Sequence, residues 1–317
     1  MHSLEKAVSE KHRVIVQLNK LGSQNASHSK LTLVQVRARP ELTDPFVALG
    51  YDTLQVNRKS SSQFSSLSSS SSSPSKAKLH FDCVGNGFDA RTRSEMASMM
   101  AHLLLQQRNC CMIRCVAKRE SSAAVLNHLL VCEVDKRMQS AQLSLSCIQC
   151  EYFDIRKFDM VNLLGRPTRR KKFLSTMDLQ RWLNGDYQQL VAGCQGQECL
   201  DFLFSFSDRN RIMYEVKFSY MQIVAGKLDT DGKVALSTCL ANLDIRPRGN
   251  TSMLVDTIRD YYSAEQEMQI WMFFEIPVQQ RLGLNGAGDI MDDMLKLAKA
   301  AYAGFNSAKV NKVGICR

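Results

Sequence analysis

The segment Glu151-Tyr-Phe-Asp-Ile-Arg-Lys-Phe158 opens the part of the chain that decides the fold, and this part ends at Pro277. Two stretches inside it, residues 200–206 and 213–220, alternate along the sequence in the manner of β-strands. Their short polar connector predicts a hairpin. A third stretch, Ile270-Trp-Met-Phe-Phe-Glu-Ile276, is almost wholly apolar, which suits a strand buried on both faces.

Helices are predicted around these strands. In residues 178–192, Leu179, Trp182 and Leu183 share one stripe, so this segment reads as an amphipathic helix. Ser175 or Thr176 is its expected N-cap, and Gly193 its expected end. Further helices are expected at residues 95–108, 122–148, 250–267 and 290–303. A further strand is expected at residues 233–240.

The composition bounds the class of protein. The chain has 317 residues and 44% hydrophobic content, enough for one large or two ordinary domains with a real core. It has no apolar run of the length a membrane span needs, and it opens on charged sequence, so we expect an intracellular protein without a membrane partner. The net charge of +10 favours acidic partners, nucleic acid first among them.

Composition also divides the chain into five expected parts. Residues 1–59 form an N-terminal region that is partly β, with strand-like stretches at 14–16 and 31–37. The serine-rich residues 60–78 are expected to be a disordered linker. The other parts are a strand-helix extension at 79–118, a core at 119–280, and a C-terminal helix and tail at 281–317.

Catalytic and metal-binding patterns are weak. The chain has eleven cysteines, but the one CxxC pair, Cys147 and Cys150, has no matching second pair for zinc. No histidine follows His128, which argues against histidine-based acid–base or nucleophilic catalysis in the best-patterned region. We therefore predict no catalytic residues, no cofactor and no metal, and rank a metal- or cysteine-dependent enzyme last.

A dense basic cluster follows the opening segment. It comprises Arg166, Arg169, Arg170, Lys171 and Lys172. Such a cluster in a Gly/Pro loop has the chemistry to contact phosphate without sequence preference. The alternative is a solvated loop. The cluster supports an alternative function for the chain, that of a basic nucleic-acid-binding protein.

The order of these segments resembles the HORMA domain family, closest to its members of the meiotic chromosome axis. Residues 151–160 resemble the segment after the family's first long helix. The stretch Leu179-Gln-Arg-Trp-Leu-Asn-Gly-Asp-Tyr-Gln-Gln-Leu190 is similar to its central helix, and the strand pair resembles the hairpin that follows. The resemblance implies an α+β fold, with a mostly antiparallel sheet packed on about three helices.

The resemblance also implies a function without chemistry. HORMA domains capture a partner's short peptide as an added strand, so the chain would be a non-enzymatic adaptor in homologue pairing and recombination. It would lie in the nucleus on chromosomes, with protein partners, indirect contact to chromatin or DNA, and self-association. The implied acceptor edge is Gln269, Ile270, Trp271, Met272, Phe273, Phe274, Glu275 and Ile276. The residues after Pro277 look helical, unlike the family's two-stranded safety belt.

Overall fold

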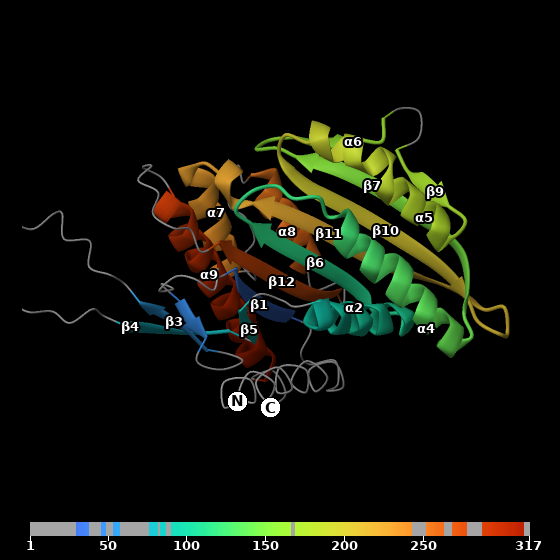
Figure 1. Ribbon diagram of the computed structural model, residues 1–317, viewed down its shortest axis with the longest axis horizontal. Helices are drawn as coiled ribbons and strands as arrows, with labels where there is room; N and C mark the ends of the chain where they lie inside the picture. The colour runs from blue at the N-terminus through green and yellow to red at the C-terminus, as the bar shows by residue number, and fades with distance from the viewer. Residues whose placement is uncertain are drawn as a thin grey trace, which may run out of the picture.

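A mixed β-sheet with helices on both faces forms the centre of the molecule (Figure 1). The computed structural model describes residues 30–37, 46–48, 53–57, 76–81, 83–86, 90–165, 169–242, 252–262, 268–277 and 287–313. Within these residues the sheet separates two apolar clusters, one on each face. The arrangement is therefore a three-layer α/β fold.

The main sheet has the strand order β5-β1-β12-β6-β11-β10-β7-β8, and β9 also pairs with β7. The bounds are β1 Lys30–Arg37, β5 Cys83–Asn86, β6 Asn109–Val116, β7 Ser144–Ile155, β8 Met160–Asn162, β9 Lys171–Phe173, β10 Gln197–Ser207, β11 Met213–Val224 and β12 Met268–Pro277. From β5 to β11 all neighbouring strands are parallel, whereas β10 is antiparallel to both β11 and β7. A separate small sheet holds β2 Phe46–Ala48, β3 Thr53–Asn57 and β4 Lys76–His80.

The helices divide between the two faces of the main sheet. One face carries α2 Ala90–Leu105, α3 Ala123–Asn127, the π-helix η1 His128–Glu133, α4 Val134–Ala141, α5 Thr176–Asn184 and α6 Asp186–Gly193. The other carries the 3-10 turn η2 Ala225–Lys227, α7 Thr230–Ala241, α8 Met253–Tyr262 and α9 Ala287–Val313. In Figure 1 α4 and α5 lie in front of the sheet, and α8 lies behind it.

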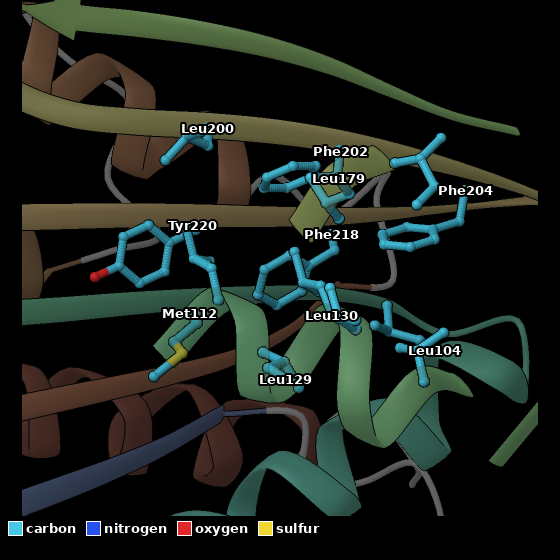
Figure 2. Close-up of a cluster of buried hydrophobic side chains, with 14 of the residues drawn as sticks. Leu104, Met112, Leu129, Leu130, Leu179, Leu200, Phe202, Phe204, Phe218 and Tyr220 are labelled. Carbon is cyan, nitrogen blue, oxygen red and sulfur yellow. The ribbon is translucent and has the colours of Figure 1, made fainter. Parts of the chain in front are cut away.

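The alternation along β10 and β11 builds the first cluster. Phe202, Phe204 and Phe218 point to one face, where they meet Leu130 of η1 and Leu179 of α5 (Figure 2). All five side chains are fully buried. Burying a side chain of this size contributes about 1.5–3 kcal/mol, so this cluster is a large part of the folding free energy.

Most predicted elements are confirmed, with three differences. The helix predicted at 178–192 is interrupted at Gly185, so α5 and α6 are separate; Ser175 caps α5 by accepting a 3.2 Å hydrogen bond from the Asp178 N–H. The helix predicted to reach residue 148 ends at Ala141, and β7 begins at Ser144. The strand predicted at residues 233–240 is wrong, since these residues lie in α7.

The expected HORMA-like sheet, mostly antiparallel and packed on about three helices, is wrong. Four pairings of the main sheet are parallel, and more than three helices cover it. The predicted peptide-binding edge at residues 269–276 is wrong as well, because these residues lie in β12. This strand pairs with β1 on one side and with β6 on the other. Its backbone groups are used by neighbouring strands, so it offers no open edge to a peptide.

The N-terminal part of the chain contributes to the main sheet. β1 comes from the predicted N-terminal region and β5 from the predicted strand-helix extension, and these two strands pair with each other. β1 also pairs with β12, so the sheet continues across the expected boundaries at residues 59, 78 and 118. The serine run at 60–75 and the strand-like stretch at 14–16 lie outside the described residues.

Candidate functional site: loops at the carboxyl end of the central strands

Three segments of the chain meet at one end of the sheet. β6, β7 and β11 point in the same direction, and β10 points the opposite way. The residues after β6, the residues after β11 and the residues before β10 are therefore neighbours. In open α/β sheets ligands bind at this carboxyl end, so it is the first place to look for a site.

The carboxyl group of Glu198 is the centre of a buried hydrogen-bond network at this end. Glu198 has no solvent exposure, and its Oε1 accepts a hydrogen bond from the Tyr187 hydroxyl of α6. Its Oε2 lies 3.5 Å from Oγ of Ser122, the residue before α3. The Ser122 hydroxyl forms a 2.6 Å hydrogen bond with the hydroxyl of Tyr220 in β11. The network thus joins α6, β10, β11 and the start of α3.

The loop after β6 is tied to β11 by a second buried side chain, Gln222. Its amide Nε2 donates to the Glu120 carbonyl at 2.9 Å and to Ser122 Oγ at 2.8 Å. Its Oε1 accepts from the Glu120 N–H at 3.3 Å. On the other side of the loop, the Arg119 guanidinium donates to the carbonyl of Gly196, just before β10. The loop is therefore held from both neighbouring segments.

Burial raises the pKa of the Glu198 carboxyl, while the Tyr187 hydrogen bond and the nearby Arg119 charge act in the opposite direction. The raised pKa means that the surroundings favour the neutral form of this carboxyl group. Tyr220 lies in the same network, and in Figure 2 its hydroxyl points away from the apolar cluster. The network is therefore the polar margin of that cluster.

Asp154, near the end of β7, holds the chain that leads into β10. Its carboxylate is fully buried and accepts from the backbone N–H of Gly196 at 2.6 Å and of Gln195 at 3.1 Å. The Cys194 thiol at 3.2 Å and the Arg156 guanidinium at 2.9 Å are further donors. Burial opposes the charge on Asp154, but the donors from Gln195, Arg156 and Gly196 hold its pKa below the ordinary value.

Gly196 is required by close backbone packing. A Cβ at this position would lie 2.0 Å from the carbonyl oxygen of Ile155. The segments after β11 and after β6 also touch: the N–H of Val224 donates to Gln197 Oε1 at 2.7 Å, and that of Gly226 donates to the Ala117 carbonyl at 3.3 Å. All three segments are thus joined directly by groups of the chain itself.

A buried arginine links the same loop to the centre of the sheet. Arg114 of β6 is 5% exposed and forms ion pairs with Glu275 of β12 and, at 2.9 Å, with Glu120. Burial opposes its charge, but the hydrogen bond to Glu275 raises its pKa. The guanidinium therefore stays charged and fixes Glu120, the residue whose backbone Gln222 also holds.

The predicted phosphate-contact cluster comprises Arg166, Arg169, Arg170, Lys171 and Lys172. Arg166 lies outside the described residues. Arg170 pairs with Glu151 at 2.9 Å, and Lys171 pairs with Asp186 at 2.8 Å. These two charges are therefore partly neutralised by the protein itself. The cluster lies on and beside β9, on a different part of the sheet from the Glu198 network.

The two cysteines of the CxxC pair do not converge. Cys147 and Cys150 are both buried in β7, and a spacing of three along a strand points them to opposite faces. In the described part of the chain, no three His, Cys, Asp or Glu side chains are grouped so that they could hold a metal ion. The same residues contain no helix with the length and apolarity of a membrane span.

The sequence reasoning missed Glu198 and Asp154, although a signal for both exists. Glu198 is in phase with Leu200 and Phe202 of the core face, and Asp154 is in phase with Tyr152. An acidic residue at a core position of an alternating strand is expected to be buried, and a buried carboxyl group needs partners. The position of each carboxyl group on the core side of its alternating strand therefore indicates that it is buried.

Comparisons with known proteins identify the fold. No family model matches the sequence, and no curated protein sequence matches it. Among solved structures, the motor domain of the Kar3-like kinesin from Ashbya gossypii is similar with a TM-score of 0.58 and 11% identity, covering 86% of this chain and 99% of that chain. The C-terminal motor and motor homology domain of Kar3Vik1, fused to a synthetic heterodimeric coiled coil, gives a TM-score of 0.61 at 10% identity, with 95% and 92% covered. The C-terminal motor domain of Kar3 from Candida glabrata gives 0.56 at 13% identity, with 84% and 99% covered.

These neighbours overturn the HORMA resemblance and what it implied. The adaptor of the meiotic chromosome axis, its peptide partners and the nucleic-acid alternative are all unsupported by the fold. The expectation that the chain is not an enzyme is overturned too, because the fold is shared with a protein described as the kinesin motor ATPase. The nuclear, chromosome-associated location stays a prediction.

A motor ATPase fold implies a magnesium–nucleotide site, and the loop after β6 is where a phosphate-binding loop would stand. The pattern G-x-x-x-x-G-K-[S/T] placed from Ala117 puts Ser122 at the second glycine, with Ala123 and Ala124 at the lysine and hydroxyl positions. These alanines supply neither the ammonium group for phosphate nor the hydroxyl for Mg²⁺. Residues 221–227 contain no carboxylate as a second metal ligand. The residues therefore do not fit a nucleotide held in this way, although the fold of this chain is that of kinesin motor domains.

Proposed function

We propose that this chain is a kinesin-like filament-binding domain whose partner is the microtubule. The supporting observation is the extent of the fold likeness: it spans 84–95% of this chain and 92–99% of the solved motor and motor homology domains. A likeness over whole domains concerns the complete architecture rather than a shared strand–helix unit. The proposal is confined to filament binding, because the loop after β6 lacks the groups that ATP hydrolysis needs.

Charge supports an acidic partner of this kind. The net charge of the chain is +10, and a surface of that sign attracts an anionic filament over the range of the Debye length. The exposed strip beside β9 carries Arg169, Lys172 and Leu174, the last 68% exposed. Among the described residues no carboxylate forms an ion pair with Arg169 or Lys172. This strip combines free positive charge with apolar area, and we propose it as a contact surface for the filament.

Co-sedimentation of the whole chain with stabilised microtubules tests the proposal. We expect binding at low salt that weakens as salt rises, because the attraction is screened. The experiment is run without nucleotide, with MgATP and with MgADP, and ATP turnover is followed in parallel. A chain that stays in the supernatant at low salt in all three conditions would contradict the filament assignment.

A pair of matched double variants locates the surface. R169E/K172E reverses two charges of the strip, and K136E/R209E reverses two exposed charges elsewhere. We expect the first to weaken microtubule binding by about tenfold and the second by much less, since contact charges act at short range. Equal losses of microtubule binding in the two variants would show that only the net charge matters. They would exclude the β9 strip as the contact surface. Circular dichroism checks that both variants are folded.

A further inference from the structure

The three segments at the carboxyl end of the sheet are joined to one another by direct protein contacts. In nucleotide-binding proteins built on a phosphate loop, loops of this kind are ordered by contacts to the γ-phosphate and its Mg²⁺. Here the corresponding contacts run from side chain to side chain and from side chain to backbone. They link residues 117–122, 194–198 and 224–227.

Within these contacts, five side chains form one connected set around Glu198: Glu198, Tyr187, Ser122, Tyr220 and Gln222. Glu198 accepts from Tyr187 and contacts Ser122, and Ser122 is bonded to Tyr220. Gln222 continues the set from Ser122 to the backbone of the loop after β6. All five of these residues, Ser122, Tyr187, Glu198, Tyr220 and Gln222, have no exposed surface. Buried polar networks of this kind rigidify their surroundings when every member is satisfied.

Neighbouring contacts, made by the residues just before Glu198, hold the segment that leads into α7. The Lys227 ammonium group donates to the Gln195 carbonyl at 2.9 Å, and the N–H of Val224 donates to Gln197. Asp229 then caps α7 by accepting from the Gly232 N–H at 2.7 Å. The position of the α7 N-terminus is therefore tied to the same loops that surround Glu198.

We propose that Glu198 and its partners Tyr187, Ser122, Tyr220 and Gln222 replace a bound nucleotide as the element that orders the three loops. Glu198 is accordingly a positioning residue: it acts on the loops and on α7 through its hydrogen bonds. The arrangement is fixed by the sequence itself and does not depend on nucleotide state. This inference concerns loop order and holds whether or not the chain binds filaments.

Hydrogen exchange of the whole chain, read by mass spectrometry, tests the inference together with thermal unfolding. In Glu198→Ala the Tyr187 and Ser122 hydroxyls lose their shared partner. We expect faster exchange in all three segments at once and a Tm lower by roughly 5 °C or more. Glu198→Gln retains an acceptor for Tyr187, and we expect it to keep the exchange pattern of the parent chain.

The control is Glu215→Ala, which removes an exposed glutamate from β11, the strand next to β10. We expect it to leave exchange in the three segments unchanged. A loss of protection confined to the residues next to Glu198, or equal effects of E198A and E215A, would overturn the inference. Should E198A fail to fold, Tyr187→Phe removes a single hydroxyl, and unchanged loop exchange in that variant would overturn it.

Nucleotide supplies the second arm of the experiment. We expect MgATP, MgADP and inorganic phosphate at millimolar concentration to change neither the Tm nor the exchange of the three segments, because no phosphate contact orders them. A rise in Tm with MgATP, accompanied by slower exchange at residues 117–122, would overturn the inference. Neither result depends on filament binding, so failure here is distinct from failure of the proposed function.

Discussion

The backbone N–H of Gly196 lies 2.6 Å from Oδ1 of Asp154, and this carboxylate has no solvent exposure. The contact joins the end of β7 to the residues that enter β10. It places an ionised side chain at the margin of two strands that are otherwise apolar on their inner face. Asp154 is thus a structural anion whose donors are mainly the backbone of the next loop.

Removal of the Asp154 carboxylate is expected to destabilise the fold strongly. Asp154→Ala removes the fully buried carboxylate and takes the acceptor away from the N–H groups of Gln195 and Gly196, and we expect a loss of about 3 kcal/mol in the free energy of unfolding. Asp154→Asn retains one acceptor oxygen, so its loss is expected to be about half as large. Urea unfolding followed by circular dichroism measures both. Asp159→Asn, at an exposed position three residues after Arg156, is the control and should be near neutral.

The pH dependence of stability has a definite sign at Asp154. The pKa is lowered in the folded state, so the group stabilises the fold above the ordinary Asp value of about 3.9, and this contribution is lost as pH falls through the lower folded value. The advantage of the parent chain over D154N should therefore shrink on acidification below about pH 4. Unfolding free energies between pH 3 and 6 check this. A constant difference across that range would show that the charge of Asp154 contributes little.

The pH dependence of stability has the opposite sign at Glu198. Burial raises its pKa, so the folded state favours the proton, and the parent chain loses stability as pH rises from the ordinary Glu value of about 4.3 through the folded value. Glu198→Gln carries no titrating group. We expect the stability of this variant relative to the parent to increase with pH over that window. Thermal unfolding from pH 4 to 8 measures the trend, and a relative stability that falls with pH would contradict it.

Two glycines offer a matched test of close packing. Gly196→Ala places a Cβ 2.0 Å from the Ile155 carbonyl oxygen, so the backbone must shift, and we expect a cost of about 3 kcal/mol. Gly193→Ala, at the end of α6, meets nothing within 4 Å and should change stability by less than about 1 kcal/mol. Chemical denaturation compares the two. Similar losses in both variants would show that the approach to Ile155 does not limit this position.

The Arg114–Glu275 ion pair is expected to show a penalty when only one of its two buried charges is removed. Arg114→Met leaves Glu275 largely buried without its guanidinium and should cost about 3–5 kcal/mol. The double variant R114M/E275M removes both charges and is expected to be more stable than R114M. Lys157→Met breaks an exposed pair with Asp229 and is expected to leave the stability close to that of the parent chain. Equal stability of R114M and the double variant, measured by urea unfolding, would exclude the loss of the guanidinium beside Glu275 as the cause.

Local patterns predicted several elements because their causes are local. The alternation in β10 and β11 reflects one buried face, and the cap of α5 depends on Ser175 and a neighbour three residues away. The strand predicted at residues 233–240 rests on a turn expected at residues 229–232, but in the structure Asp229 caps α7 there. Its helical spacing shows only in the burial of Leu236, Cys239 and Leu240 against α9 and the sheet. A short apolar run does not distinguish the two states.

The sheet order could not be read in the same way. The composition of residues 270–276 suits burial on both faces, and β12 is indeed a central strand, yet the family resemblance placed it at an edge. Its partners, β1 and β6, lie far away in the sequence, and parallel pairing leaves no turn between the strands to detect. The Glu198 network has the same character, since it combines α6, β10, β11 and the residue before α3.

The central place of β12 also constrains how the protein is made. β1 and β5 leave the ribosome early, but the strand that connects them to β6 ends at Pro277. Until that segment is synthesised, the backbone N–H and C=O groups along one edge of β1 and of β6 are without their native partner. Synthesis at about 5–20 residues per second leaves both edges open for many seconds. The nascent chain therefore passes through a long interval in which these unpaired strand edges are accessible to chaperones.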